Sequence, residues 1–291
     1  MTNPCYEKFE KKWPVKAYKS LEFLNSPAAR PVRILSEFIE PGERYKKHKI
    51  KNTVVVFGSA RIKPRAKALA RLKEVEKVLV KMRTVSPKAK AELKSAKVDL
   101  CASKYYEDAR ELSKRITLWF KQIEKKGIHF AVCTGGGPGI MEAANRGAYE
   151  AKGMSIGMNI SLPMEQHPNP YQTKEVSSEF HYFFIRKFWF TYLAKALIVF
   201  PGGYGTLDEL FEVLTLVQTK KIDKKMTVVL YGKEFWNKLI NFEVMEEWGT
   251  VLKEELKLFK IVDTVDEAYD HLKNEIMYLV KEKEKYKKYW R

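Results

Sequence analysis

One carboxylate in the sequence follows a glycine-rich turn at a spacing that suits chemistry. In the segment IVFPGGYGTLDELFE an apolar run ends at Phe200, three glycines follow, and Glu209 lies three residues after Thr206. Successive backbone N–H groups at such a turn can bind an anion, and the start of a helix favours negative charge. A carboxylate beside a bound phosphate is repelled, so placing Glu209 there is costly unless it takes part in a reaction.

The same spacing has a structural interpretation. Thr206-x-x-Glu209 matches a capping box, in which the two side chains only satisfy the free N–H groups of a helix start. Three glycines before the cap are more than a helix start needs, because one residue is enough to begin the turn. We therefore favour a functional role for Glu209, with Gly202, Gly203 and Gly205 as an anion-binding turn.

A second glycine-rich turn lies in the segment VCTGGGPGIMEAANRGA, where a helix is expected to begin near Pro138 or Gly139. The segment has neither a clean GxGxxG pattern nor the GK[ST] of a P-loop. The phosphate or ribose of a mononucleotide therefore fits it better than a dinucleotide. The alternative is close packing of a strand on a helix. The predicted substrate contacts in this turn are Gly135, Gly136, Gly137 and Gly139.

A third, weaker turn is VVVFGSAR, where Gly58 and Ser59 follow an apolar run directly. Glycine permits a tight turn from strand to helix, and a serine hydroxyl can donate to a phosphate. A simple turn without a ligand explains the pattern equally well. We include Gly58 and Ser59 among the predicted substrate contacts.

Two basic residues interrupt an aromatic-rich run between the second and third turns. Arg186 and Lys187 lie in the segment SSEFHYFFIRKFWFTYLAKA, for which we expect a helix near Phe183 to Tyr192. A guanidinium group in such a run must contact a carboxylate, a phosphate or an aromatic face. The alternative is an arginine that reaches from an amphipathic helix into solvent.

Short apolar runs alternate with helical patterns from Thr53 onward, which is typical of β-α units. The sequence therefore predicts an α/β fold, a Rossmann-like doubly wound parallel sheet with an N-terminal helical arm and a helical insertion. The expected strands are 53–57, 129–133, 155–159, 196–200, 227–230 and 260–262.

The expected domain organisation follows from the same patterns. We predict an N-terminal helical arm over 1–50 and a nucleotide-binding catalytic domain over 51–265. Within that domain, 63–102 are interpreted as a basic helical insertion, and 266–291 as a C-terminal helix with a basic tail.

The composition limits the class of protein. The 291 residues carry a formal charge of +18, and 61–104 hold fourteen Lys or Arg against four acids. Such a surface attracts polyanions, but Lys-rich helices are more often simply solvated, so we expect weak nucleic-acid binding at most.

No apolar run is long enough to span a membrane, and no secretory signal is visible. The three cysteines show no zinc or disulfide spacing. We expect a cytoplasmic protein with no membrane partner and no bound metal.

The two larger glycine turns, with the Arg-Lys dipeptide between them, resemble the LONELY GUY (LOG) family, whose members were long mislabelled lysine decarboxylases. The family pattern PGGxGTxxE is matched in full by PGGYGTLDE, residues 201–209. The resemblance covers roughly Thr53 to Val262 without the insertion. The arm, the insertion and the tail are absent from the short plant-type members, and GPGIMEAANRGA looks like the longer bacterial branch, often labelled AMP nucleosidase.

The resemblance implies a function and a set of site residues. It implies hydrolysis of the N-glycosidic bond of a nucleoside 5′-monophosphate, such as AMP or a cytokinin riboside 5′-monophosphate, by a homo-oligomer (dimer or higher) without a cofactor. Glu209 and Arg186 would be catalytic. The implied substrate contacts are Glu165, Lys187, Gly202, Gly203, Tyr204, Gly205, Thr206, Leu207 and Asp208. The alternative is a non-catalytic nucleotide-binding Rossmann protein that contacts nucleic acid.

Overall fold

The computed structural model describes residues 14–82, 84–125, 127–161, 167–222 and 224–287, with only the backbone for 278–287. The chain forms two compact units, residues 1–43 and 44–291. The predicted site residues all belong to the second unit. The predicted division at 50 and 265 stays a prediction.

The first unit consists of short helical turns followed by most of one long helix. Its elements are η1 (Ala17–Lys19), α2 (Leu21–Asn25), η2 (Pro27–Ala29) and α3 (Arg30–Lys47), the last of which continues into the second unit. The Ser20 side chain accepts from the N–H of Phe23 and caps α2. Arg33 donates to the carbonyl groups of Leu24 and Ser26 at 2.6 and 2.7 Å, which holds the turn against α3.

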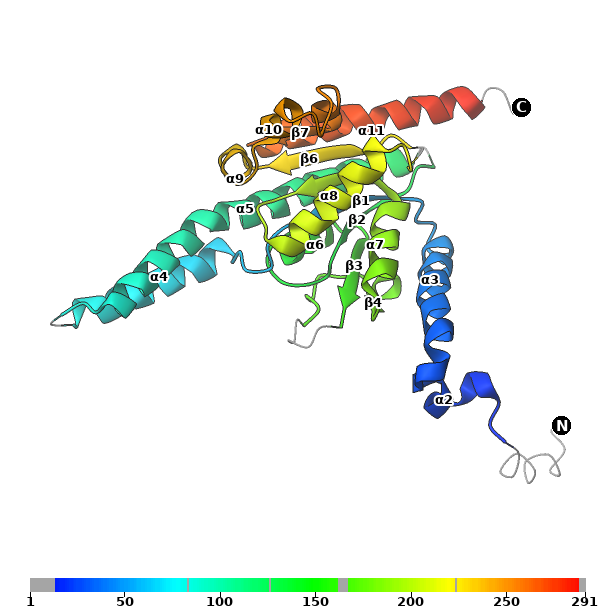
Figure 1. Cartoon of the computed structure of the whole chain (residues 1–291), viewed down its shortest axis with the longest axis horizontal. Helices are drawn as coiled ribbons and strands as arrows, with labels where there is room; N and C mark the ends of the chain where they lie inside the picture. Colours follow the sequence, from blue (N-terminus) through cyan, green and yellow to red (C-terminus); the bar gives the residue numbers. More distant parts are fainter. Residues whose placement is uncertain (1–13, 83, 126, 162–166, 223, 288–291) are drawn as a thin grey trace. The chain divides into compact units, whose positions relative to one another are not determined.

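The second unit is built on a parallel sheet, as predicted. In the described part of the chain the sheet has seven strands in the order β4-β3-β2-β1-β5-β6-β7, all parallel (Figure 1). A strand missed in the sequence is β4, which has only three residues. The strands are β1 (Asn52–Phe57), β2 (Phe130–Thr134), β3 (Ser155–Ile160), β4 (Ser178–Phe180), β5 (Ala194–Val199), β6 (Thr227–Tyr231) and β7 (Phe259–Val262).

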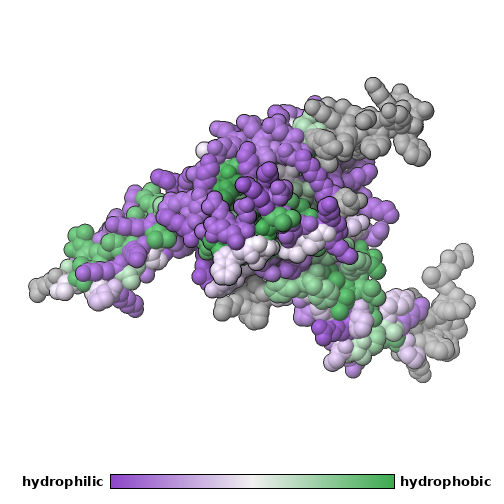
Figure 2. Space-filling model, turned by 45° about the horizontal axis from the view of Figure 1, so that its top comes forward, coloured by the Kyte–Doolittle hydropathy of each residue, from purple (hydrophilic) through white to green (hydrophobic). Residues whose placement is uncertain are grey.

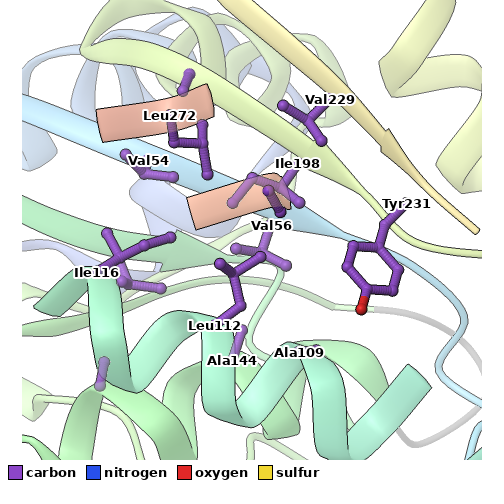
Figure 3. Packing of buried hydrophobic residues seen from close by; sticks show 14 of the residues in the cluster. Val54, Val56, Ala109, Leu112, Ile116, Ala144, Ile198, Val229, Tyr231 and Leu272 are labelled. Carbon is purple, nitrogen blue, oxygen red and sulfur yellow. The ribbon is translucent and has the colours of Figure 1, made fainter. Parts of the chain in front are cut away.

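Helices cover both faces of this sheet. On one face, Val54 and Ile198 of the central strands pack against Leu112, Ala144 and Leu272, which come from three different helices (Figure 3). Burying each such valine, leucine or isoleucine contributes roughly 1.5–3 kcal/mol. The helices of this unit are α4 (Arg65–Val80), α5 (Pro87–Glu124), α6 (Ile140–Glu150), α7 (Phe183–Tyr192), α8 (Tyr204–Gln218), α9 (Lys233–Leu239), α10 (Phe242–Glu247) and α11 (Val265–Lys287), with 3-10 turns at Lys174–Val176 and Glu255–Leu258.

The opposite face carries the helices that bear the predicted catalytic pair. Because side chains alternate along a strand, Phe57 faces away from Val56 and meets Phe190 of α7 edge-on, with ring centroids 4.8 Å apart. Leu210 and Val213 are the buried apolar side chains on the inner face of α8. The sheet thus fixes α7 and α8 near its centre.

The basic segment 63–102 forms α4 and the first part of α5, which run side by side (Figure 1). Ser86 caps α5 by accepting from the N–H of Ala89. Pro87 occupies the first turn, where the N–H that proline lacks would have had no partner within the helix. The buried side chains of α5 begin at Ala96 and continue to Ile123. One continuous helix therefore serves both the insertion and the core.

None of the helices in the described ranges is both long enough and apolar enough to cross a membrane.

Candidate active site

The three glycine turns meet at one edge of the sheet. They follow the carboxyl ends of β1, β2 and β5, where the strand order reverses and where open parallel sheets bind ligands. Hydrogen bonds join them directly: the N–H of Ser59 donates to Pro201 O at 2.9 Å, and the N–H of Ile140 donates to Ser59 O at 3.1 Å. The structure thus brings the predicted turns together.

The turn after β5 presents an open helix start. Helix α8 begins at Tyr204 with Gly203 as its N-cap, and no side chain caps it. A Cβ atom on Gly203 or Gly205 would meet nothing within 4 Å. The N–H groups of a first helical turn have no partners within the helix, so this uncapped start can receive an anion.

The capping-box interpretation of Thr206 and Glu209 is wrong. Thr206 is the third residue of α8 rather than its cap, and its side chain packs over Gly202. The N-cap lies three residues earlier than the capping-box pattern suggests, because Gly203 takes that position and Gly205 lies in the first turn of the helix. Glu209 therefore does not lie at the N-terminus as a capping partner.

Glu209 lies in the second turn of α8 with only 8% of its surface exposed. Burial raises the pKa of Glu209 to about 7, while the positive charges of Arg186 and Lys187 act in the opposite direction. Within the described ranges its carboxylate accepts no hydrogen bond. A buried carboxylate that titrates near neutrality and keeps its lone pairs free can take a proton from a substrate or from water.

Arg186 projects from α7 into the same edge of the sheet. Its Nε donates to Met158 O at 2.8 Å, its Nη2 to Gly135 O at 3.3 Å, and its guanidinium lies 5.0 Å from the ring centroid of Phe190. Burial lowers the pKa of Arg186 and the charge of Glu209 opposes that shift. An arginine stays charged under such conditions. Arg186 thus fixes α7 to the ends of two strands rather than reaching into solvent.

Lys187 points to the outer side of α8. Its Nζ pairs with Asp208 at 3.0 Å and with Glu212 at 2.9 Å. Burial disfavours the charged amine, but the carboxylates of Glu212 and Asp208 outweigh this and raise the pKa of Lys187. Lys187 and Asp208 therefore neutralise each other here, and their expected contacts with a substrate stay predictions.

The turn after β2 is packed rather than open. Gly136 and Gly139 have φ angles of 73° and 71°, which only glycine adopts without strain. A Cβ atom on Gly136 would collide with Asn159 Oδ1, and one on Gly139 with Ser59 O. A Cβ atom on Gly135 would likewise collide with the guanidinium of Arg186. Close packing of strand and helix, the alternative considered for this turn, accounts for these three glycines.

A network of amides missed in the sequence fixes this turn. Asn169 Nδ2 donates to Gly136 O and Gly137 O, both at 3.0 Å, and Gln172 Nε2 donates to Gly136 O at 2.7 Å. Asn145 joins the network through Asn169 at 2.9 Å. The sequence does contain one signal of this network. Asn145 lies among apolar residues of a helical pattern, and a buried amide requires a hydrogen-bond partner.

The remaining predicted residues are placed as follows. A Cβ atom on Gly58 would lie 2.7 Å from Ile140, so this glycine permits close packing of a helix. Ser59 Oγ accepts from the N–H of Arg61. Tyr204 is 93% exposed beside the open helix start, and Leu207 follows in the next turn. Glu165 lies outside the described residues.

No group of three or more His, Cys, Asp or Glu side chains within the described ranges could hold a metal ion.

Comparison with known proteins identifies similar chains. A family model described as possible lysine decarboxylase matches residues 141–272, a range that includes Arg186 and Glu209. The chain is 32% identical over 124 residues to the cytokinin riboside 5′-monophosphate phosphoribohydrolase LOG of Oryza sativa subsp. japonica, a match covering 42% of this chain and 49% of that protein. The chain thus spans about half the length of this relative.

Two further similarities are more distant. The probable cytokinin riboside 5′-monophosphate phosphoribohydrolase LOGL3 of the same plant is 29% identical over 162 residues, which are 54% of this chain and 74% of that protein. Among solved structures, the Moco carrier protein from Chlamydomonas reinhardtii is 20% identical, with a TM-score of 0.42 over 78% of this chain and 99% of that one.

Proposed function

We propose that this chain is a member of the LOG family and, from that premise, that it is a hydrolase acting on nucleoside 5′-monophosphates. The proposed reaction cleaves the N-glycosidic bond and releases the free base and ribose 5-phosphate. We propose AMP as a substrate and a cytokinin riboside 5′-monophosphate as the other candidate, because the two rice relatives carry the latter name. No cofactor takes part in the proposed reaction.

The observation that carries the proposal is the state of Glu209. Its carboxylate is buried close to the guanidinium of Arg186, its pKa is raised to about 7 by burial, and it follows an uncapped helix start. A protein that only holds a nucleotide gains nothing from a buried carboxylate beside a phosphate, because the two charges repel each other. A catalytic role compensates for that repulsion.

The proposed mechanism uses the open start of α8 as the phosphate site. Cleavage of a ribosyl C–N bond passes through a state with oxocarbenium character, which a nearby carboxylate stabilises. Water attacks C1′ and gives a proton to Glu209, while the bonding electron pair leaves with the base, which takes up a proton from solvent water. Glu209 then releases its proton to solvent. Arg186 favours the ionised form of Glu209 and holds α7 in place through the carbonyl groups of Met158 and Gly135.

The test is a substrate panel. Purified full-length protein is incubated with AMP, GMP, CMP, UMP and a cytokinin riboside 5′-monophosphate, and the released base is followed by chromatography. We expect adenine from AMP and much slower release from adenosine, because remote binding of the phosphate supplies orientation. Equal rates on AMP and adenosine would remove the role proposed for the glycine turns, and no release from any nucleotide would favour the non-catalytic alternative.

We further propose that the enzyme is a homo-oligomer, a dimer or higher. Phe183, Phe184 and Tyr192 of α7 are all more than half exposed, and large aromatic side chains gathered on one helix are typical of a surface covered in an assembly. Light scattering that shows a monomer at micromolar concentration would contradict this proposal.

We propose a cytoplasmic location on the basis of cysteine chemistry. Cys101 and Cys133 are free thiols in the described part of the chain, which suits a reducing compartment.

A further inference from the structure

The α4–α5 hairpin carries a concentrated positive charge at its distal end, which we define as residues 77–97. This stretch contains seven Lys or Arg and one acid, Glu92. Glu92 is already paired with Arg71 of α4. None of the six lysines of this stretch forms an ion pair with a carboxylate in the described ranges. The distal end is therefore a strong and uncompensated cationic surface. Its lysines are Lys77, Lys81, Lys88, Lys90, Lys94 and Lys97.

The same distal end exposes aliphatic side chains. Val80 is 87% exposed, and Val78, Met82 and Val85 are each more than a third exposed. Between the two helices lies a groove of about 360 Å³ whose apolar lining is Val75, Val78, Leu79, Met82 and Ala89, and Glu74, Lys88 and Glu92 also line it. Figure 2 shows hydrophobic residues gathered at this end of the molecule, next to hydrophilic ones.

The outer face of α5 repeats this combination. Lys90, Lys94 and Lys97 surround Leu93 and Val98 in a second, shallower depression of about 370 Å³. Lysines one turn apart beside aliphatic residues place their ammonium groups outward while their methylene stems extend the apolar surface. Two adjoining surfaces of the hairpin therefore combine cationic and aliphatic groups.

Charge and apolarity together restrict the partner. A second copy of this chain would bring two cationic hairpins together, and the repulsion opposes that contact. Nucleic acid would satisfy the lysines, but it offers no apolar surface to exposed valine and methionine side chains. The surface of an anionic lipid bilayer satisfies both groups, because headgroups attract the lysines and the acyl boundary takes the aliphatic side chains.

We propose that the distal end of the α4–α5 hairpin docks on an anionic lipid surface. Val78, Val80, Met82 and Val85 enter the boundary between headgroups and acyl chains, and the six lysines contact the headgroups. The expectation of no membrane partner rested on the lack of a spanning segment, which does not concern a surface contact. The proposal is independent of the reaction, because the hairpin end contains no residue of the candidate active site.

The test is flotation of the full-length protein with vesicles. We expect roughly ten-fold or more binding to vesicles of mixed phosphatidylcholine and phosphatidylserine over vesicles of phosphatidylcholine alone, since each basic residue near an anionic surface contributes about five-fold. Added salt should weaken the binding by screening. Equal binding to both kinds of vesicle, or binding to neither, would overturn the proposal.

Two variant pairs separate apolar insertion from simple charge attraction. Val80→Ser with Met82→Ser keeps the net charge and should lower vesicle binding roughly ten-fold, because exposed aliphatic groups lose their place in the boundary. The matched control is Val244→Ser with Leu252→Ser, which removes two exposed apolar groups elsewhere and should bind as the parent does. Lys88→Gln with Lys90→Gln should also weaken binding, whereas Lys253→Gln with Lys257→Gln should change it much less.

Four further measurements separate the proposal from its alternatives. AMP turnover and melting temperature of the Val80→Ser, Met82→Ser variant should equal those of the parent, which shows that the fold is intact. Tight, salt-resistant binding to duplex DNA that is unaffected by the serine changes would assign the surface to nucleic acid instead. Dissociation of an oligomer by the same changes, seen in light scattering, would assign it to a second copy.

Discussion

The glycine turn after β2 and the glycine turn after β5 have similar sequences and different surroundings. In the first, Gly136 and Gly139 hold left-handed backbone angles and lie where any Cβ would collide with a neighbour. In the second, Gly203 and Gly205 face open space at an uncapped helix start. Glycine permits close backbone packing in the first turn and leaves the backbone accessible in the second.

This difference shows that a run of glycines does not by itself indicate a phosphate site. Asn169 and Gln172 already occupy the carbonyl groups of the β2 turn, so that turn is held by the protein itself. The β5 turn has no comparable network in the described ranges, and its helix leads directly to Glu209. We therefore expect substitutions in the turn after β2 to change the stability of the fold, and substitutions in the turn after β5 to change substrate binding.

The largest expected effect comes from comparing two glutamates, one from the helix that follows each glycine turn. Glu209→Gln should lower AMP turnover about a hundred- to ten-thousand-fold, because an amide cannot take a proton from water. Glu142→Gln in the first turn of α6 is the matched control. Glu142 accepts from the Tyr106 hydroxyl at 2.7 Å, a bond that a glutamine oxygen preserves, so turnover should stay near that of the parent. Turnover of Glu209→Gln close to the parent value would exclude the proposed mechanism.

The next effect is on the free energy of unfolding. Gly136→Ala should lower it by about 2–4 kcal/mol, because alanine strains the positive φ angle and its Cβ collides with Asn159. Gly205→Ala should leave it unchanged or raise it by up to about 1 kcal/mol, since alanine favours an exposed helical position. Urea unfolding of both variants measures these free energies. Equal values for the two variants would contradict the distinction between a packed and an open turn.

A smaller effect depends on pH and concerns Glu209 alone. Burial raises the pKa of Glu209 from 4.5 to about 7, so the folded state keeps a proton that the unfolded state loses between these values. Stability of the parent relative to Glu209→Gln should therefore fall by up to about 3 kcal/mol as pH rises from about 4.5 to 7, and then stay level. Urea unfolding of both proteins across this range measures the difference; a constant difference would mean that Glu209 is ionised throughout.

The smallest effect concerns affinity at the open turn. Gly205→Ala should weaken AMP binding roughly ten-fold, because the added methyl group occupies space through which a phosphate approaches the backbone N–H groups. Adenosine binding should hardly change, since adenosine has no phosphate, and it serves as the internal control. Calorimetric titration of both ligands decides the matter. An equal loss for AMP and adenosine would place the phosphate elsewhere.

Much of the fold could be predicted from local patterns. The apolar runs predicted six of the strands, and the aromatic run predicted α7 with its observed bounds, Phe183 to Tyr192. Strand β4 escaped because three residues carry too little alternation to be recognised. The start of α8 was misplaced because Thr206 and Glu209 fit a cap so well that the glycines before them were assigned to a loop.

The candidate site was only partly visible in the sequence. Arg186 and Glu209 could be singled out because charged groups within apolar or glycine-rich segments require an explanation. Their surroundings could not, because Asn169 and Gln172 donate to the turn after β2, and Asn159 lies against Gly136, across long stretches of chain. Such tertiary contacts leave no periodic signal, and only the folded structure separates the packed turn from the open one.

The continuity of α5 limits how the hairpin can change in length. Because the helix that leaves the hairpin is also the helix that packs on the sheet, the insertion is not a cassette that can be cut out at its ends. A deletion inside α5, between the hairpin and the part that packs on the sheet, turns these two parts of the helix relative to each other: by only about 20° when seven residues are removed, but by roughly 140° when five are removed. Designed deletions inside α5 should therefore be whole heptads, which leave the hairpin in its direction while Leu112 and Ile116 stay packed on the sheet.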